Sequence, residues 1–132
     1  MTEIIYKELS YELNGIFYSI YSIYNVLGCI HSERQYQDAV EIRFKQRGVK
    51  FEREKDLLFD FEDSKIGGNK VDFVAEAKIP IDIKAKKYIT KRDFKQMLRY
   101  LKAGNYKLGP IVNFGSLNKI TIKRIINSGF KK

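Results

Sequence analysis

Two stretches near the start of the chain carry apolar residues at helical spacing. The first predicts a helix from about Leu9 to Leu27, which Gly28 ends. Its apolar stripe consists of Ile16, Ile20, Ile23 and Leu27. Ser32 is a favoured N-cap residue, so a second helix is predicted from there to about Gln46.

Patterns typical of strands follow these helices. Residues 49–61 carry apolar and aromatic side chains throughout and predict extended chain. The Gly-Gly-Asn run at 67–69 predicts a turn that leads into a strand over residues 70–77. In the next strand, three isoleucines at alternate positions point to one face, while Asp82 and Lys84 point to the other.

A third helix and two closing strands complete the pattern. Thr90 is its expected N-cap, with Asp93 in the acidic position of a capping box, and Gly104 is expected to end it. Its apolar stripe is predicted to consist of Phe94, Met97, Leu98 and Leu101. Strands are expected over residues 109–114 and 119–126. The order helix, helix, three strands, helix, two strands predicts an α/β (α+β) fold with a mixed central sheet flanked by helices.

Composition limits the class of protein. The chain has 132 residues, 44% of them apolar, which predicts a single folded domain over residues 1–132. Lys and Arg number 25 against 16 acidic residues, and the resulting charge of +9 favours a polyanionic partner. A compositional bias towards Lys and Ile is the alternative explanation of that charge.

The single cysteine and the hydropathy indicate a compartment. Cys29 stands alone, which excludes an intrachain disulfide and a zinc site made of several cysteines. No secretory signal or membrane span is expected, because the most apolar early stretch, Gly15–Gly28, is too short and too polar. A cytoplasmic protein is therefore expected.

Two carboxylates fall on neighbouring predicted strands. Asp72 interrupts an otherwise apolar strand, and Asp82 lies on the next one. Two such groups can converge on one Mg²⁺, which prefers oxygen ligands and keeps several waters. Lys84 shares the face of Asp82, so its ammonium could orient or deprotonate a water on that ion, or stabilise charge on a phosphate. The alternative is a solvated strand face, where alternating acids and bases are ordinary.

A further acid begins the second predicted helix. At about 100° per residue, Glu33 lies within about 20° of Val40 and Phe44 on the helix circumference. An acid on that buried side is costly unless it is paired or bound to metal. The alternative is a first-turn acid favoured by the helix dipole.

The third helix offers a polar pair. Gln96 and Tyr100 lie four residues apart, on a face that they are predicted to share with Arg92 and Arg99. This set could hold a phosphate or its attacking water, although an exposed helix surface explains it equally well. His31, the only histidine, is interpreted as a polar turn residue before it is considered as a ligand or base.

These residues resemble a known family when they are taken in order. Leu27-Gly28 followed by Glu33-Arg34-Gln35-Tyr36 is similar to the signature of the GxxExxY proteins, a branch of the PD-(D/E)xK nuclease superfamily. Further matching blocks are Lys70-Val71-Asp72, Ile81-Asp82-Ile83-Lys84-Ala85, Gln96-Met97-Leu98-Arg99-Tyr100-Leu101 and Val112-Asn113-Phe114-Gly115. The similarity extends from about Tyr11 to Asn127. Cys29 and Ile30 depart from the proline and glycine expected in the turn, and Asp82 replaces the commoner glutamate.

The resemblance implies a nuclease that depends on Mg²⁺ or Mn²⁺ and acts on nucleic acid, with DNA favoured. The metal ligands that it implies are Glu33, Asp72, Asp82 and the carbonyl of Ile83. Lys84 would position the attacking water, and Gln96 and Tyr100 resemble the Q-x-x-x-Y element of RecB and Cas4 nucleases. The basic residues expected to bind flanking phosphates are Lys86, Lys87, Lys91, Arg92, Lys95 and Arg99.

Two other classes stay open at this point. A catalytically inactive nucleic-acid-binding module on the same fold would bind without metal and release no products. A protein-interaction or regulatory domain would show nucleic-acid affinity indifferent to salt. The sequence also leaves open the substrate's strandedness, the choice between DNA and RNA, and the oligomeric state, including a homodimer.

Overall fold

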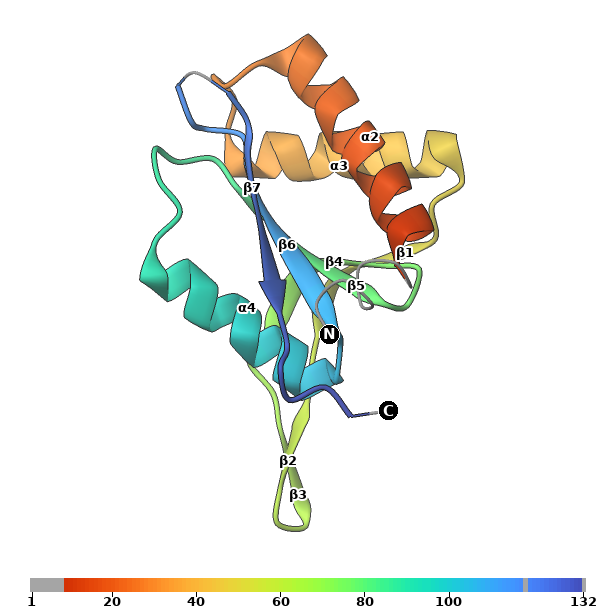
Figure 1. Ribbon diagram of the computed structural model, residues 1–132, viewed down its shortest axis with the longest axis vertical. Coiled ribbons are helices and arrows are strands. Elements are labelled where there is room, and N and C mark those ends of the chain that lie inside the picture. The colour runs from red at the N-terminus through yellow and green to blue at the C-terminus, as the bar shows by residue number, and fades with distance from the viewer. Residues whose placement is uncertain (1–8, 118, 132) are drawn as a thin grey trace.

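A computed structural model describes residues 9–117 and 119–131, and its centre is a mixed sheet of five strands (Figure 1). In spatial order the strands are β1 (Phe51–Asp56), β4 (Lys70–Ala75), β5 (Ile79–Lys84), β6 (Leu108–Asn113) and β7 (Thr121–Ile126). Neighbours pair antiparallel except β5 and β6, which are parallel. The mixed sheet with flanking helices confirms the predicted fold class.

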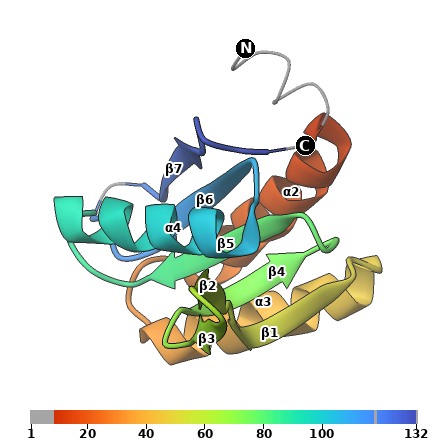
Figure 2. The ribbon, with the colours of Figure 1, turned by 90° about the horizontal axis from the view of Figure 1, so that it is seen from below.

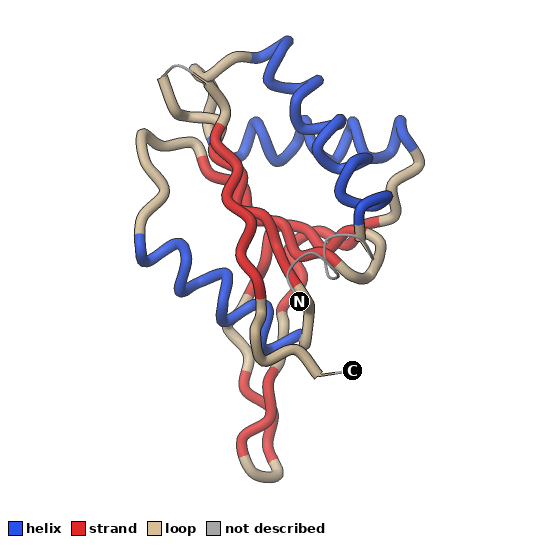
Figure 3. Tube along the Cα trace, in the orientation of Figure 1, coloured by secondary structure: helices blue, strands red, loops and turns tan. Residues whose placement is uncertain are grey.

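Helices cover both faces of this sheet. The helices are α2 (Ser10–Leu27), α3 (Glu33–Arg47) and α4 (Lys91–Gly104). Figures 1 and 3 show α2 and α3 together on one side of the strands, with α4 on the other, and in Figure 2 α4 lies in front of the strands. The larger apolar cluster lies under α2 and α3 and contains the three isoleucines of β5. A smaller cluster joins α4 to β4 and β6. None of the helices in these described ranges is long and apolar enough to cross a bilayer.

Local signals set the helix boundaries as predicted. Ser32 accepts a hydrogen bond from the Gln35 backbone N–H, and the Gln35 side chain accepts one from the Ser32 N–H. Thr90 and Asp93 form the same reciprocal pair at the start of α4. The predicted end of α4 is wrong by one residue. Gly104 is still helical, and Asn105 ends the helix in the left-handed region, where asparagine is tolerated.

The inward face of α4 differs from the prediction. Met97 and Leu101 are buried as predicted, but Leu98 is exposed. Gln96 and Tyr100 were predicted on a face shared with Arg92 and Arg99, but Tyr100 is buried and Gln96 partly buried, whereas both arginines are exposed. The reason is the surface that α4 covers. Gln96 turns inward to the Lys84 side chain of β5, and Tyr100 turns inward to the Lys70 carbonyl of β4.

The long extended stretch predicted over residues 49–61 is interrupted. Strand β1 ends at Asp56, and a separate hairpin of β2 (Phe59–Phe61) and β3 (Ser64–Ile66) follows. This hairpin projects from the end of the sheet (Figure 1). Its base is closed by the Asp56 carboxylate, which accepts hydrogen bonds from the N–H groups of Gly68 and Asn69. Residues 67–69 lead into β4 as predicted but form no regular turn; the turn lies at residues 62–63, within a hairpin that the sequence did not predict.

A candidate metal and catalytic site on β4, β5 and α4

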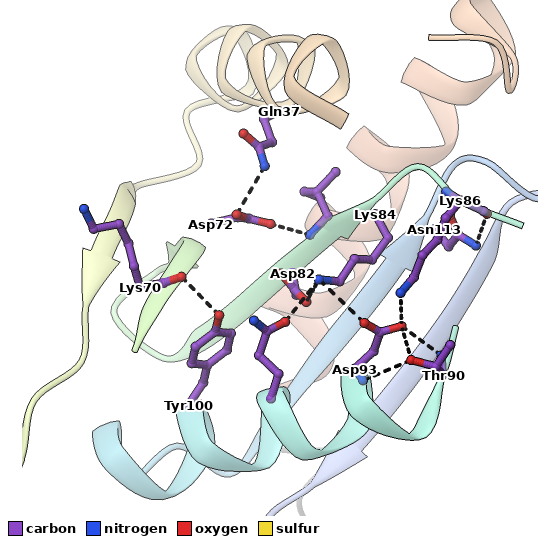
Figure 4. Close-up of polar contacts among 12 residues, drawn as sticks. Gln37, Lys70, Asp72, Asp82, Lys84, Lys86, Thr90, Asp93, Tyr100 and Asn113 are labelled. Atoms are coloured by element: carbon purple, nitrogen blue, oxygen red, sulfur yellow. Dashed lines mark hydrogen bonds and ion pairs between the residues drawn. The ribbon is translucent and has the colours of Figure 1, made fainter. Parts of the chain in front are cut away.

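Two aspartates face each other where β4 and β5 meet. The register pairs Phe73 with Ile81, so Asp72 stands opposite Asp82 one step further along. Asp72 Oδ2 accepts a hydrogen bond of 2.7 Å from the Ile83 backbone N–H. The Asp72 side chain thus bonds to the β5 backbone at this point, and Figure 4 shows it between β5 and α3.

A glutamine from α3 holds the other oxygen of Asp72. Gln37 Nε2 donates to Asp72 Oδ1 at 3.2 Å, and Arg53 in turn donates to Gln37 Oε1 at 3.4 Å. Nothing in the sequence singled out Gln37, because it is one polar residue among many on α3. Its importance follows only from the packing of α3 against the sheet.

The aspartate pair is short of positive charge. Asp82 is only 3% exposed, and its Oδ2 has no hydrogen-bond partner among the described residues. The ammonium of Lys84 lies 3.1 Å from that oxygen as an ion pair. Burial and the negative charge of Asp82 raise the pKa of Asp72. A buried carboxylate pair with an unsatisfied oxygen is an arrangement that a divalent cation would stabilise.

Lys84 lies at the centre of the polar cluster in Figure 4. Its Nζ donates to Gln96 Oε1 at 3.1 Å and lies 3.8 Å from Asp93 Oδ1. Burial lowers the pKa of Lys84, but the nearby carboxylates of Asp82, Asp93 and Glu33 outweigh it and raise that pKa overall. The side chain therefore remains a cation at neutral pH.

Asp93 is a site residue that sequence reasoning identified only as a helix cap. It is buried, its Oδ2 accepts from the Thr90 N–H at 2.8 Å, and Lys86 Nζ lies 2.6 Å from the same oxygen. Burial raises the pKa of Asp93, but the bonds from Lys86 and Thr90 outweigh it and lower that pKa. The capping-box pattern was visible in the sequence, whereas the two lysines around it were not.

The two α4 residues of the predicted site have different surroundings. Gln96 contacts Lys84, whereas the Tyr100 hydroxyl donates to the Lys70 carbonyl at 3.1 Å. Burial and the charges of Asp82 and Asp72 raise the pKa of Tyr100, so its hydroxyl keeps its proton. Tyr100 thereby ties α4 to the strand that carries Asp72.

Glu33 begins α3 and is exposed, although its carboxyl is within reach of the site's charges. Burial raises the pKa of Glu33, with the charge of Lys84 lowering it and that of Asp82 raising it. The preceding turn is braced by Tyr36, whose ring stacks on Phe114. The Tyr36 hydroxyl donates to a backbone carbonyl and accepts from a backbone N–H of that turn.

The ligand set for a metal ion is limited. Within residues 9–117 and 119–131, no three His, Cys, Asp or Glu side chains converge closely enough to hold an ion together. Asp72 and Asp82 therefore stand as a pair. A pair still suits Mg²⁺, which is commonly held by one or two carboxylates and keeps several waters.

The six basic residues predicted to bind phosphate do not all have the same surroundings. Lys86 is paired with Asp93, so it belongs to the site itself. The outward-facing residues are Lys87, Lys91, Arg92, Lys95 and Arg99. Their use in binding stays a prediction.

Comparison with known proteins identifies the family of this chain. Residues 7–125 match the PD-(D/E)XK nuclease superfamily. The crystal structure of SSO0001 is similar, with a TM-score of 0.56 and 19% sequence identity. The match covers 93% of this chain and 61% of that protein. At this identity the likeness concerns the fold alone. No curated protein gives a significant sequence match. Because the family match extends over most of its length, the chain belongs to the PD-(D/E)XK nuclease superfamily.

Proposed function

We propose that this protein is a metal-dependent nuclease of the GxxExxY branch, which hydrolyses phosphodiester bonds of nucleic acid, with DNA favoured. The observation that carries the proposal is the buried Asp72–Asp82 pair with Lys84 beside it. An ordinary ion-pair network would satisfy the oxygens of both acids. Here Asp82 Oδ2 is buried and lacks a hydrogen bond from any described residue.

Asp72 and Asp82 would hold one or two Mg²⁺ or Mn²⁺ ions, with the carbonyl of Ile83 and waters as further ligands. The Glu33 carboxylate does not converge with this pair and would act on a water of the ion. A bound divalent ion lowers the pKa of its water and neutralises charge that builds on the phosphoryl oxygens. Gln37 would keep Asp72 oriented, because it donates to the oxygen that the Ile83 N–H leaves free.

Lys84 would orient the attacking water and balance the charge of the scissile phosphate. Because its pKa is raised, the ammonium holds its proton at neutral pH and is a poor proton acceptor. Gln96 would act as a positioning residue, since its Oε1 accepts from the ammonium. Tyr100 would position β4 through its bond to Lys70 and donate a proton to neither water nor phosphate.

The outward basic residues of α4 and the loop before it would bind the flanking phosphates. Lys91, Arg92, Lys95 and Arg99 are exposed on the helix that also contributes Gln96 to the site. Contacts of this kind fix the backbone of the nucleic acid and read no sequence. Affinity should therefore fall steeply with salt and vary little with sequence.

The test is cleavage of labelled DNA and RNA, single-stranded and double-stranded, in Mg²⁺ or Mn²⁺, with metal binding followed by calorimetry. Wild type should cut, and Asp82→Asn should lose both cutting and metal binding while it still binds nucleic acid. Lys84→Ala should lose cutting and keep the metal, because Lys84 acts on water and phosphate. A wild-type protein that cuts nothing across the panel and binds no metal would overturn the proposal.

A second candidate is a nucleic-acid-binding module that does not cut. The observation that favours it is the lack, among the described residues, of three converging metal-ligating side chains. This candidate predicts binding that is the same with and without divalent metal, and no cleavage products.

A further inference from the structure

Two loops leave the sheet at the same end, beside the candidate site (Figure 1). One follows β5 and leads into α4, and the other joins β6 to β7. Because β5 and β6 are parallel, both strands finish at the same end of the sheet, where Lys84 pairs with Asn113, and both loops start there. Residues from both loops line a hollow of about 370 Å³. The loop residues are Lys87, Tyr88, Ser116, Leu117 and Lys119, and Thr121 at the start of β7 completes the lining.

A buried asparagine fastens the two loops together. Asn113 Oδ1 accepts from the N–H groups of Lys86 and Gly115, both at 3.0 Å. Its Nδ2 donates to the Lys86 carbonyl at 2.7 Å and to Ser116 Oγ at 3.2 Å. Figure 4 shows the bonds between Asn113 and Lys86. All four hydrogen-bonding positions of this amide are used, so the loops are held in one arrangement.

The loops also approach more closely than a side chain would allow. A Cβ atom on Gly115 would lie 2.3 Å from the Lys86 backbone N and 2.8 Å from the Lys86 carbonyl oxygen. Backbone atoms cannot give way as a flexible side chain can. The hollow is therefore built into the fold before any ligand arrives, which lowers the cost of binding.

Its lining combines exposed apolar surface with positive charge. Tyr88 and Leu117 are each 76% exposed, although both are large apolar residues. Lys87 and Lys119 line the same hollow. An exposed aromatic ring beside ammonium groups suits an unstacked nucleobase and its phosphate, because every base has a face that can stack. The volume lies within the range of about 300–1,000 Å³ found for small-molecule sites.

Lys86 connects this hollow to the candidate catalytic site. Its ammonium pairs with Asp93, which lies 3.8 Å from Lys84 Nζ, while its backbone is held by Asn113. We propose that the hollow is a nucleobase subsite in which Tyr88 stacks on an unpaired base and Lys87 and Lys119 bind its phosphate. The preferred substrate is then nucleic acid with a single-stranded segment beside the scissile bond. This inference rests on the proposed nuclease function.

The test measures binding in the presence of a metal chelator, so that no strand is cut. Fluorescence anisotropy compares a labelled single-stranded oligonucleotide with a blunt duplex of the same sequence. Tyr88→Ala should weaken single-strand binding by roughly five- to a hundredfold, the usual effect of removing one stacking ring. Duplex affinity should change by less than about twofold, because paired bases are not available to the ring.

Two control variants separate stacking from other effects. Tyr88→Phe keeps the ring and should bind the single strand like wild type. Tyr11→Ala removes a tyrosine that is 88% exposed on α2 and should also leave binding unchanged. Unchanged single-strand affinity in Tyr88→Ala, or an equal loss on the duplex, would overturn the subsite.

A separate cleavage assay distinguishes this inference from the function on which it rests. If wild type cuts nothing but Tyr88→Ala loses single-strand binding, the subsite stands and the nuclease proposal fails. If wild type cuts and Tyr88→Ala binds single strands as well as wild type does, the subsite alone fails.

Discussion

Two buried aspartates near Lys84 have opposite surroundings. Asp93, at the start of α4, accepts hydrogen bonds from Thr90 and pairs with Lys86, and its pKa is lowered. Asp82, on β5, has a buried oxygen without a hydrogen-bond partner among the described residues and stands opposite a second acid. The carboxylate of Asp93, which stabilises the start of α4, therefore has its hydrogen bonds and its charge matched by neighbouring residues. The Asp72–Asp82 pair sets two facing carboxylates beside the Lys84 ammonium, 3.1 Å from Asp82 Oδ2, and a bound divalent cation would offset the remaining negative charge.

The largest effect expected from this difference is on activity. Asp82→Asn keeps the shape of the side chain and removes its charge, so cleavage in Mg²⁺ should fall by at least about 10²-fold. Asp93→Ala should lower cleavage by only about tenfold, since Asp93 acts through Lys84 and binds no metal. The measurement is the single-turnover cleavage rate of each variant. Equal losses in the two variants would break the comparison.

Stability should respond in the opposite order. Asp93→Ala removes one half of the capping box on α4 and should lower the free energy of unfolding by about 1–2 kcal/mol. Asp82→Asn removes the repulsion between two facing acids together with the ion pair to Lys84, and because these two losses oppose each other it should change that free energy less than Asp93→Ala does. Urea unfolding with a metal chelator present measures both. A large destabilisation by Asp82→Asn would mean that Asp82 serves the fold.

Helix α4 allows nucleic-acid binding to be tested separately from activity and stability, because Asp93 faces inward and the basic residues face outward. Reversing the charge of Lys91, Arg92 and Lys95 together should weaken nucleic-acid affinity on the order of tenfold and reduce its dependence on salt. The free energy of unfolding should stay close to that of wild type. Affinity is measured by anisotropy across a salt series. Unchanged affinity would locate the binding surface elsewhere.

The smallest expected effect is the dependence of folding stability on pH, which has opposite signs for Asp72 and Asp93. The folded pKa of Asp72 is raised above 3.8, so its contribution to stability is full below that pH and is lost as pH rises through the folded value. The folded pKa of Asp93 is lowered, so its contribution is present above 3.8 and is lost as pH falls through the folded value.

Urea unfolding from pH 3 to 8 without metal tests both signs. Asp72→Asn should flatten the fall in stability towards neutral pH, and Asp93→Ala should flatten the loss on the acid side. Mg²⁺ should restore stability to wild type at neutral pH and leave Asp72→Asn unaffected. A wild-type protein whose stability rises steadily to pH 8 without metal would contradict the raised pKa of Asp72.

Long-range packing explains which features sequence reasoning missed. Gln37 bonds to Asp72 across 35 positions of the chain, and Asn113 bonds to Lys86 across 27. Neither residue stands out from its neighbours in the sequence, because its partner is far away along the chain. The rotation of α4 was wrong for the same reason. Helical spacing groups residues into faces, but contacts with the sheet decided that Tyr100, bonded to the Lys70 carbonyl of β4, lies inward and that Leu98 lies outward.

The sequence by itself determined what depends on near neighbours. Capping boxes at Ser32 and Thr90 are closed within three residues, and the alternation in β5 assigns Asp82 and Lys84 to one face. Only the tertiary structure decided which of those polar groups are satisfied. It gives Asp93 a hydrogen bond from Thr90 and an ion pair with Lys86, whereas the buried Asp82 Oδ2 has an ion pair with Lys84 and no hydrogen bond from the described residues. Whether a buried polar group has a hydrogen bond or an ion pair depends on contacts between separate elements, and no local sequence pattern encodes those contacts.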